Sequence, residues 1–197
     1  MSSETRGVFL DLKGVGDSPP VVLGMAVDDG FEQIIVDTAF GDAALAKDLR
    51  VNRLEDEVRS LVARCRSEDR LIFGFSRHVL DCIEQHTSCA DSVADLYEDA
   101  QQLVQLWNEK TERTSTSDWT LANHLANMGK PQPRHLGAKH TASRLRYVEQ
   151  QLRKHGAYDA ISGGAKAKWT KLLQQNQSDT LGLQMLTQHA AQALAQP

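Results

Sequence analysis

The sequence contains few cysteines, and their placement argues against two kinds of structural site. Cys65, Cys82 and Cys89 are odd in number, and no two of them form a Cys-x-x-Cys pair. This pattern disfavours a disulfide framework or a zinc site and predicts reduced thiols in the cytoplasm. The chain also has no apolar run long enough to cross a membrane and no signal-like apolar segment near Met1, so we expect no membrane partner.

Motifs of several common enzyme classes are missing as well. The chain has no Gly-x-Ser-x-Gly elbow, no Walker loop and no His-Glu-x-x-His pair. Gly14-Val15-Gly16 is too short and wrongly placed to form a dinucleotide-binding loop. The sequence therefore gives no support for the reaction classes that depend on these motifs.

The positive charge of the chain is concentrated in one segment. Residues 1–129 hold 12 Lys and Arg against 23 Asp and Glu, whereas residues 130–175 hold 10 Lys and Arg against 2 acidic residues. Such a segment can form a face that binds the phosphates of nucleic acid. The partner that we expect is a single strand. The alternative is a solvated helical face that offsets an acidic body, in which case a protein partner becomes the better hypothesis.

Hydrophobic periodicity predicts an α/β fold. Apolar runs predict strands, and helical spacing at i, i+3 and i+4 predicts helices. The predicted strands are residues 8–10, 21–27, 31–36 and 71–75, the first three forming an antiparallel meander. The predicted helices are residues 54–65, 76–85, 96–109, 119–128, 141–154, 165–174 and 180–195. We expect a mixed sheet, with a meander plus parallel strands, packed helices and a helical C-terminal extension.

Three aspartates stand at positions from which their carboxylates could converge. Asp11 ends the first apolar run, and Asp81 and Asp179 lie on predicted helices. Carboxylates gathered from a strand end and two helices are what a two-metal phosphodiester site needs, because Mg²⁺ and Mn²⁺ prefer oxygen ligands. The alternative for Asp81 and Asp179 is a charge at a helix N-terminus or an acid on the surface.

The order of these elements resembles the ribonuclease H-like fold of the DEDD 3′–5′ exonuclease superfamily, most closely its bacterial predicted ribonuclease H-like exonuclease domains. The matching stretches are residues 9–13, 75–81 and 175–179, within a resemblance that covers roughly residues 7–190. They stand where the family has Leu-Asp-Ile-Glu-Thr on a first strand, Tyr-Asn-Gly-x-x-Phe-Asp after a later strand, and His/Tyr-Asn-x-x-Asp at the start of a late helix. The resemblance implies a metal-dependent nuclease.

The resemblance also implies roles for individual residues. Asp11, Asp81 and Asp179 take the places of catalytic carboxylates that hold Mg²⁺ or Mn²⁺. Ser76 takes the place of the asparagine in the second motif and is also a candidate helix N-cap. The basic segment supplies further candidates for contacts with a nucleic acid substrate, namely His140, Arg144, Arg146 and Arg153, although His140 could equally face solvent.

Two positions depart from the family pattern. Lys13 replaces the second acid of the first motif and, because strand side chains alternate, lies on the same side of its strand as Asp11. Gln175 stands near the place of a Tyr or His that helps to activate the attacking water, and a glutamine is no base near neutral pH. We therefore expect a nuclease-like protein with impaired catalysis. The alternative is a non-catalytic ribonuclease H-like module, without a metal, that binds nucleic acid or a protein partner.

The sequence predicts a single domain over residues 1–197 with three parts. A sheet-bearing core spans residues 7–110, and a helical insertion with a basic face spans residues 111–175. A C-terminal helix over residues 176–197 then carries Asp179.

Overall fold

Alternating apolar residues near the start of the chain form an antiparallel meander, as their pattern predicts. Its strands are β1 (Gly7–Lys13), β2 (Val22–Val27) and β3 (Gly30–Ile35). A tight turn joins β2 to β3 at Asp28, whose backbone is left-handed with a φ of 51°. The predicted antiparallel meander is therefore confirmed.

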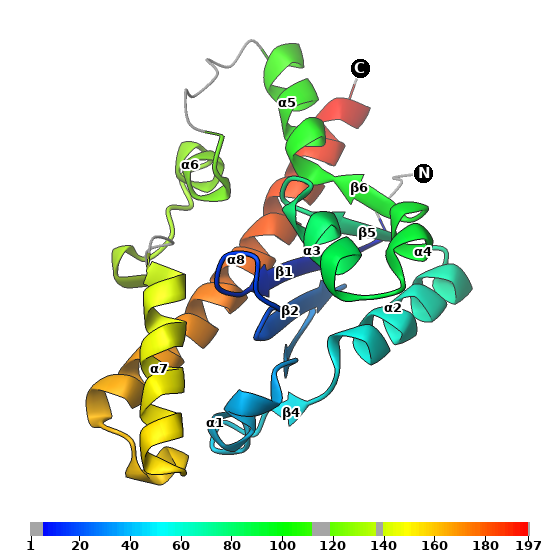
Figure 1. Cartoon of the computed structure of the whole chain (residues 1–197). Coiled ribbons are helices and arrows are strands. Elements are labelled where there is room, and N and C mark those ends of the chain that lie inside the picture. Colours follow the sequence, from blue (N-terminus) through cyan, green and yellow to red (C-terminus); the bar gives the residue numbers. More distant parts are fainter. Residues whose placement is uncertain (1–5, 112–118, 137–139, 197) are drawn as a thin grey trace.

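Later strands extend both edges of this meander in parallel. β5 (Leu71–Gly74) pairs with β1, β6 (Tyr97–Asp99) pairs with β5, and β4 (Arg50–Val51) pairs with β3. Together the strands form a six-stranded mixed sheet in the order β4-β3-β2-β1-β5-β6. The computed structural model describes residues 6–111, 119–136 and 140–196 (Figure 1), and in these residues the predicted α/β fold with a mixed sheet is confirmed.

Helices make up most of the remaining described chain. The α-helices are α1 (Gly41–Leu45), α2 (Leu54–Glu68), α3 (His78–His86), α4 (Ala90–Ala94), α5 (Ala100–Lys110), α6 (Leu121–Asn127), α7 (Thr141–His155) and α8 (Gly163–Ala195). Short 3₁₀ turns are η1 (Thr38–Phe40), η2 (Arg134–Leu136) and η4 (Tyr158–Ala160). Within the described ranges, none of these helices is both long and apolar enough to cross a membrane.

The strand β6 corrects the helix predicted over residues 96–109. Tyr97 pairs with Ile72 of β5, so the chain is extended where the sequence spacing favours a helix. The helix α5 begins only after this strand, and the Asp99 carboxylate caps it by accepting a hydrogen bond from the Gln101 backbone N–H at 2.9 Å. Pairing with a neighbouring strand has overridden local helical spacing here.

Helices cover the sheet on both faces. Val8, Leu10 and Leu12 of β1 point to one side and pack in one cluster with buried residues of α2, α3 and α4. Alternation sends Phe9 to the other side, where it packs with Leu183 of α8. Figure 1 shows α8 crossing behind the sheet, with α2 and α3 in front of it. Polar residues on the α8 side of β1 are therefore enclosed between strand and helix.

The helix α8 is one continuous element of 33 residues. The sequence predicts two helices here, over residues 165–174 and 180–195, each from its own helical spacing. The helix continues because Gln175, Asn176 and Asp179 are buried in the interior and hydrogen-bonded there. The expected boundary between residues 175 and 176 thus falls inside α8.

Gly24→Ala tests how closely α8 approaches the sheet. A Cβ at Gly24 would lie 2.5 Å from both Asn176 Oδ1 and Thr180 Oγ1. Both side chains are fully buried and hydrogen-bonded, so they cannot swing away. We expect the free energy of unfolding, measured by urea denaturation, to fall by about 1–3 kcal/mol, the usual cost of overpacking.

Gly41→Ala is the matched control for this substitution. A Cβ at Gly41 would meet nothing within 4 Å, and its backbone is already helical with a φ of −56°. We expect this variant to be as stable as the wild type or slightly more so. Equal stability of the two variants would contradict the close contact between β2 and α8.

Candidate functional site

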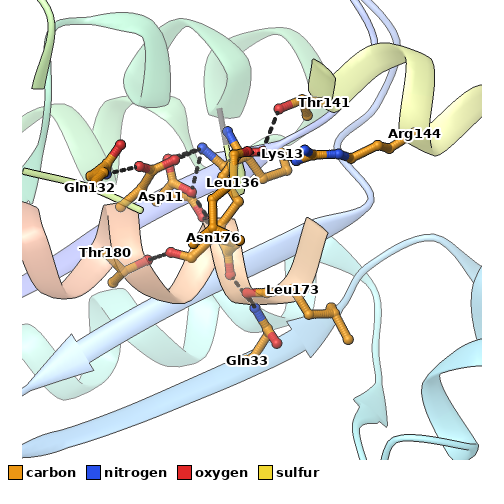
Figure 2. Close-up of polar contacts among 12 residues, drawn as sticks. Asp11, Lys13, Gln33, Gln132, Leu136, Thr141, Arg144, Leu173, Asn176 and Thr180 are labelled. Atoms are coloured by element: carbon orange, nitrogen blue, oxygen red, sulfur yellow. Dashed lines mark hydrogen bonds and ion pairs between the residues drawn. The ribbon is translucent and has the colours of Figure 1, made fainter. Parts of the chain in front are cut away.

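Strand alternation places Asp11 and Lys13 on the α8 side of β1. Both side chains reach residues of α8, whereas their neighbour Leu12 packs in the cluster on the opposite face. Across the sheet from Asp11 lies Gly24, which has no side chain. This gap lets Asn176 of α8 come close enough to hydrogen-bond Asp11 (Figure 2).

The Lys13 ammonium lies between two carboxylates. Its Nζ is 2.5 Å from Asp179 Oδ2 and 3.0 Å from Asp11 Oδ2. The side chains are only 12% exposed for Lys13, 21% for Asp11 and 10% for Asp179, so water screens these charges weakly. The ion pairs join β1 directly to α8. We call these three residues the Lys13 cluster.

Amide side chains complete the hydrogen bonding of the Lys13 cluster. The Asn176 amide donates to Asp11 Oδ2 at 2.7 Å and to the Asp11 carbonyl at 2.9 Å. Its own oxygen accepts from the Gln33 amide of β3 at 2.6 Å, and Gln132 donates to the second oxygen of Asp179. The network therefore links two strands, α8 and the segment between α6 and α7.

The charges in the cluster do not balance. Two carboxylates share one ammonium, which leaves an excess of negative charge in a weakly hydrated place. Burial raises the pKa of Asp11 to about 6, with Asp179 adding to the rise and Lys13 and Asn176 opposing it. Burial alone would lower the pKa of the Lys13 ammonium, but its attraction to Asp11 and Asp179 outweighs burial and raises that pKa. Lys13 thus stays charged.

Beside the cluster, Arg144 of α7 is buried, with only 6% of its surface exposed. Its guanidinium donates to the Leu136 carbonyl at 2.7 Å, to Gln175 Oε1 at 2.9 Å and to the His135 carbonyl at 3.2 Å. These bonds fix α7 and η2 against α8. The Arg144 guanidinium, a candidate for phosphate contact, therefore donates its hydrogen bonds to groups inside the protein. Gln175 is one of the acceptors.

Asp81 lies outside the Lys13 cluster. Its side chain is 55% exposed on α3, and its carboxylate pairs with Arg77 Nε at 2.7 Å. Among the described residues, no hydrogen bond or ion pair joins Asp81 to the cluster. The structure thus joins two of the three predicted carboxylates in one bonded network.

The remaining candidates lie at other places. Ser76 follows β5 with a left-handed φ of 66°, and its hydroxyl accepts from the His78 backbone N–H at 3.4 Å, although Arg77 holds the N-cap position of α3. His140, Arg146 and Arg153 are exposed on or next to α7. Of these, Arg153 is paired with Glu149 at 2.5 Å.

The donor set of the cluster does not suit a pair of divalent cations. Asp11 and Asp179 both bond to an ammonium, a fixed positive charge that two metals roughly 4 Å apart would have to displace. In the part of the chain that the structure describes, no group of three or more His, Cys, Asp or Glu side chains is arranged to hold a metal ion. The predicted Mg²⁺ or Mn²⁺ site stays a prediction.

Sequence reasoning missed the amides that surround the cluster. Gln33, Gln132 and Asn176 come from three distant parts of the chain and follow no motif. One signal was present in the sequence. Polar residues 176, 179 and 180 lie on the same face of α8 as the apolar Leu172 and Leu183, because each of them lies three, four or seven residues from others of these positions. The two leucines mark this face as buried. A buried polar stripe on a helix requires polar partners on the sheet.

The raised pKa of Asp11 makes stability depend on pH in a defined direction. Folded Asp11 titrates at about 6, compared with 3.8 for the ordinary group, so the folded state binds more protons between these values. This group therefore lowers the free energy of unfolding as the pH rises from 3.8 to 6. Asp11→Asn removes the titration and the excess charge. We expect its stability relative to the wild type to increase from about pH 4 to about pH 7 in urea denaturation.

Asp28→Asn provides the control for this measurement. Hydrogen bonds from Arg70 hold the pKa of Asp28 below its ordinary value of 3.8, so its titration lies outside the tested range. The stability difference between Asp28→Asn and the wild type should stay nearly constant over that range. If the stability difference between Asp11→Asn and the wild type is equally constant, burial does not raise the pKa of Asp11.

Comparison with known proteins does not assign the chain to a family. No family model matches it, and searches among curated proteins and solved structures gave no significant match. The charge arrangement of the Lys13 cluster is therefore the main basis for a functional conclusion.

Proposed function

We propose that the chain is a non-catalytic ribonuclease H-like module that binds single-stranded nucleic acid. In this module the Lys13 ammonium takes the electrostatic place of a metal ion. The mixed sheet, with an antiparallel meander and later parallel strands, is the arrangement that the resemblance to DEDD exonucleases implies. Asp11 on the first strand and Asp179 on the last helix also agree with it.

The observation that carries the proposal is the position of the Lys13 ammonium. It bonds to both Asp11 and Asp179 at 3.0 Å or less. A metal-dependent exonuclease uses such carboxylates as ligands, and its metals orient the attacking water and stabilise the leaving oxygen. An ammonium can offset one of the two carboxylate charges, but it offers no open coordination position for water or phosphate. The site therefore favours a binding module over an exonuclease.

The distribution of basic residues supports a nucleic acid partner. Most of the described basic residues between 130 and 171 are exposed, namely Lys130, Arg146, Arg153, Lys154 and Lys171. The segment carries an excess of eight positive charges, 10 Lys and Arg less 2 acidic residues, on a chain whose net charge is −4. A local basic face on an acidic protein concentrates attraction for phosphate at one place.

Lys13→Glu tests whether the ammonium stands in for a metal. This change places a third carboxylate beside Asp11 and Asp179 and removes the positive charge between them. We expect Lys13→Glu to bind Mn²⁺ in titration calorimetry, and the wild type to bind it at most weakly.

Lys13→Met is the matched control for this titration, since it removes the ammonium without adding an oxygen ligand. It should bind Mn²⁺ more weakly than Lys13→Glu. If Lys13→Glu binds Mn²⁺ no better than the wild type does, residue 13 does not control cation binding at the cluster. The proposal that the Lys13 ammonium takes the place of a metal ion is then wrong.

The binding function itself is tested with a labelled single strand in Mn²⁺ buffer. We expect fluorescence anisotropy to show binding that weakens steeply with salt, at about −0.7 in log K per log salt for each phosphate neutralised. Replacing Arg146 and Arg153 together by Gln should flatten that slope by up to roughly 1.4 units. The strand should keep its length during the experiment.

Two results would contradict the proposed function. Shortening of the strand by the wild type would restore the exonuclease hypothesis. A lack of binding even at low salt would leave the basic segment as a solvated surface and would favour a protein partner.

A further inference from the structure

A groove lies beside the strand that carries Lys13, at the end of β3 and the start of α2. Its volume is about 910 Å³, within the usual range for ligand pockets. Residues of α2, α3, α7 and η1 line it, together with the loop that connects β1 to β2. The backbone N–H of Val21, on its floor, donates to the Lys13 carbonyl at 2.7 Å. The groove and the Lys13 cluster therefore share one end of β1.

The floor of the groove is apolar. It is formed by Val15, Val21, Val36, Phe40, Leu54 and Leu145. Phe40 stacks on the buried Trp169 with 5.5 Å between ring centroids, which holds its ring in a fixed place. A flat or apolar part of a ligand can pack against such a surface.

Two arginines of the groove carry free positive charges. Arg53 and Arg146 line it, and within the described residues neither guanidinium makes a hydrogen bond or ion pair. His86 adds an imidazole to the same lining. Two unpaired guanidinium groups above an apolar floor are suited to an anionic group such as phosphate.

The acidic residues of the groove are already engaged. Glu55 pairs with Arg59 at 2.9 Å and accepts from the Ser88 hydroxyl at 2.6 Å. Glu149 pairs with Arg153 at 2.5 Å, and the Asp37 carboxylate accepts from the Ala39 backbone N–H at 2.9 Å. Glu55 and Glu149 are thus neutralised by arginines outside the lining, whereas Asp37 keeps its charge. Arg53 and Arg146 against Asp37 leave an excess of one positive charge in the groove, which favours an anion over a cation.

We infer that this groove binds a nucleoside phosphate, with the base against the apolar floor and the phosphate on Arg53 and Arg146. The inference rests on the proposed nucleic acid function and names a site for it that lies apart from the Lys13 cluster. The shared chemistry has two sources, a free nucleotide and the phosphorylated end of a single strand. Arg146 would serve both the groove and the basic face of α7, whereas Arg53 belongs to the groove alone.

The test is a titration with adenosine monophosphate, followed by calorimetry and by NMR of the arginine side-chain N–H signals. We expect the Arg53 and Arg146 signals to shift, and adenosine without phosphate to bind at least about tenfold more weakly. Arg53→Gln and Arg146→Gln should each weaken binding by about tenfold, the factor for losing a charge-assisted hydrogen bond. Both positions are exposed, so the variants should stay folded.

Arg66→Gln is the matched control, because Arg66 is exposed on α2, the helix that follows Arg53, but does not line the groove. It should bind adenosine monophosphate as the wild type does. Absence of binding at millimolar nucleotide, or an equal loss in the Arg66 and Arg53 variants, would overturn the inference.

Oligonucleotides with and without a terminal phosphate separate this inference from the proposed function. Tighter binding of the phosphorylated strand, lost in Arg53→Gln, supports a strand end as the occupant. Nucleotide binding lost in Arg53→Gln, without any strand binding, supports a free nucleotide and contradicts the proposed function. Strand binding that is unchanged in Arg53→Gln overturns the groove as its site and leaves the proposed function standing.

Discussion

The interaction on which the rest of the structure depends is the contact of the Lys13 ammonium with Asp11 and Asp179. It joins the central strand β1 to the long helix α8 in a place that water scarcely reaches. Removing one partner from a buried ion pair typically costs about 3–5 kcal/mol, because the other charge is left uncompensated. Neighbouring features accommodate the contact, since Gly24 leaves room for α8 and the amides of Gln33, Gln132 and Asn176 satisfy oxygens that would otherwise be unpaired.

The same contact supports the proposed binding function over the exonuclease alternative. Two divalent metals would bring four positive charges and several coordination positions, whereas Lys13 brings one charge and donors that the carboxylates already use. The network therefore holds β1 against α8. The proposed binding surfaces are the exposed basic residues of α7 and the neighbouring groove, where Arg53 and Arg146 have no carboxylate partner among the described residues. In the proposed function, the chain is a scaffold held by a buried ion-pair network, with a basic surface for binding.

Much of the fold follows from local sequence patterns, but the site does so only in part. Alternation predicts the meander and the shared side of Asp11 and Lys13, and helical spacing predicts α2 and α7 closely. The two helices expected on either side of Gln175 are one helix, because the polar residues there meet polar partners inside the protein, which the sequence does not show. The sequence predicts Arg144 on a basic face, yet its side chain is buried. Composition does not distinguish a surface arginine from one that binds backbone carbonyls. The strand β6 depends on pairing with β5, which no local pattern reveals.

The central claim is tested most directly by NMR of the unmodified protein, with the Asp11 carboxyl carbon and the Lys13 Nζ observed during a pH titration. The account predicts that Asp11 titrates at about 6, while the Lys13 ammonium stays protonated and exchanges its protons slowly with water. The signal of the exposed Lys154 gives the reference for fast exchange. Titration of Asp11 near its ordinary value of about 4, together with Lys13 protons that exchange as fast as those of Lys154, would contradict the account.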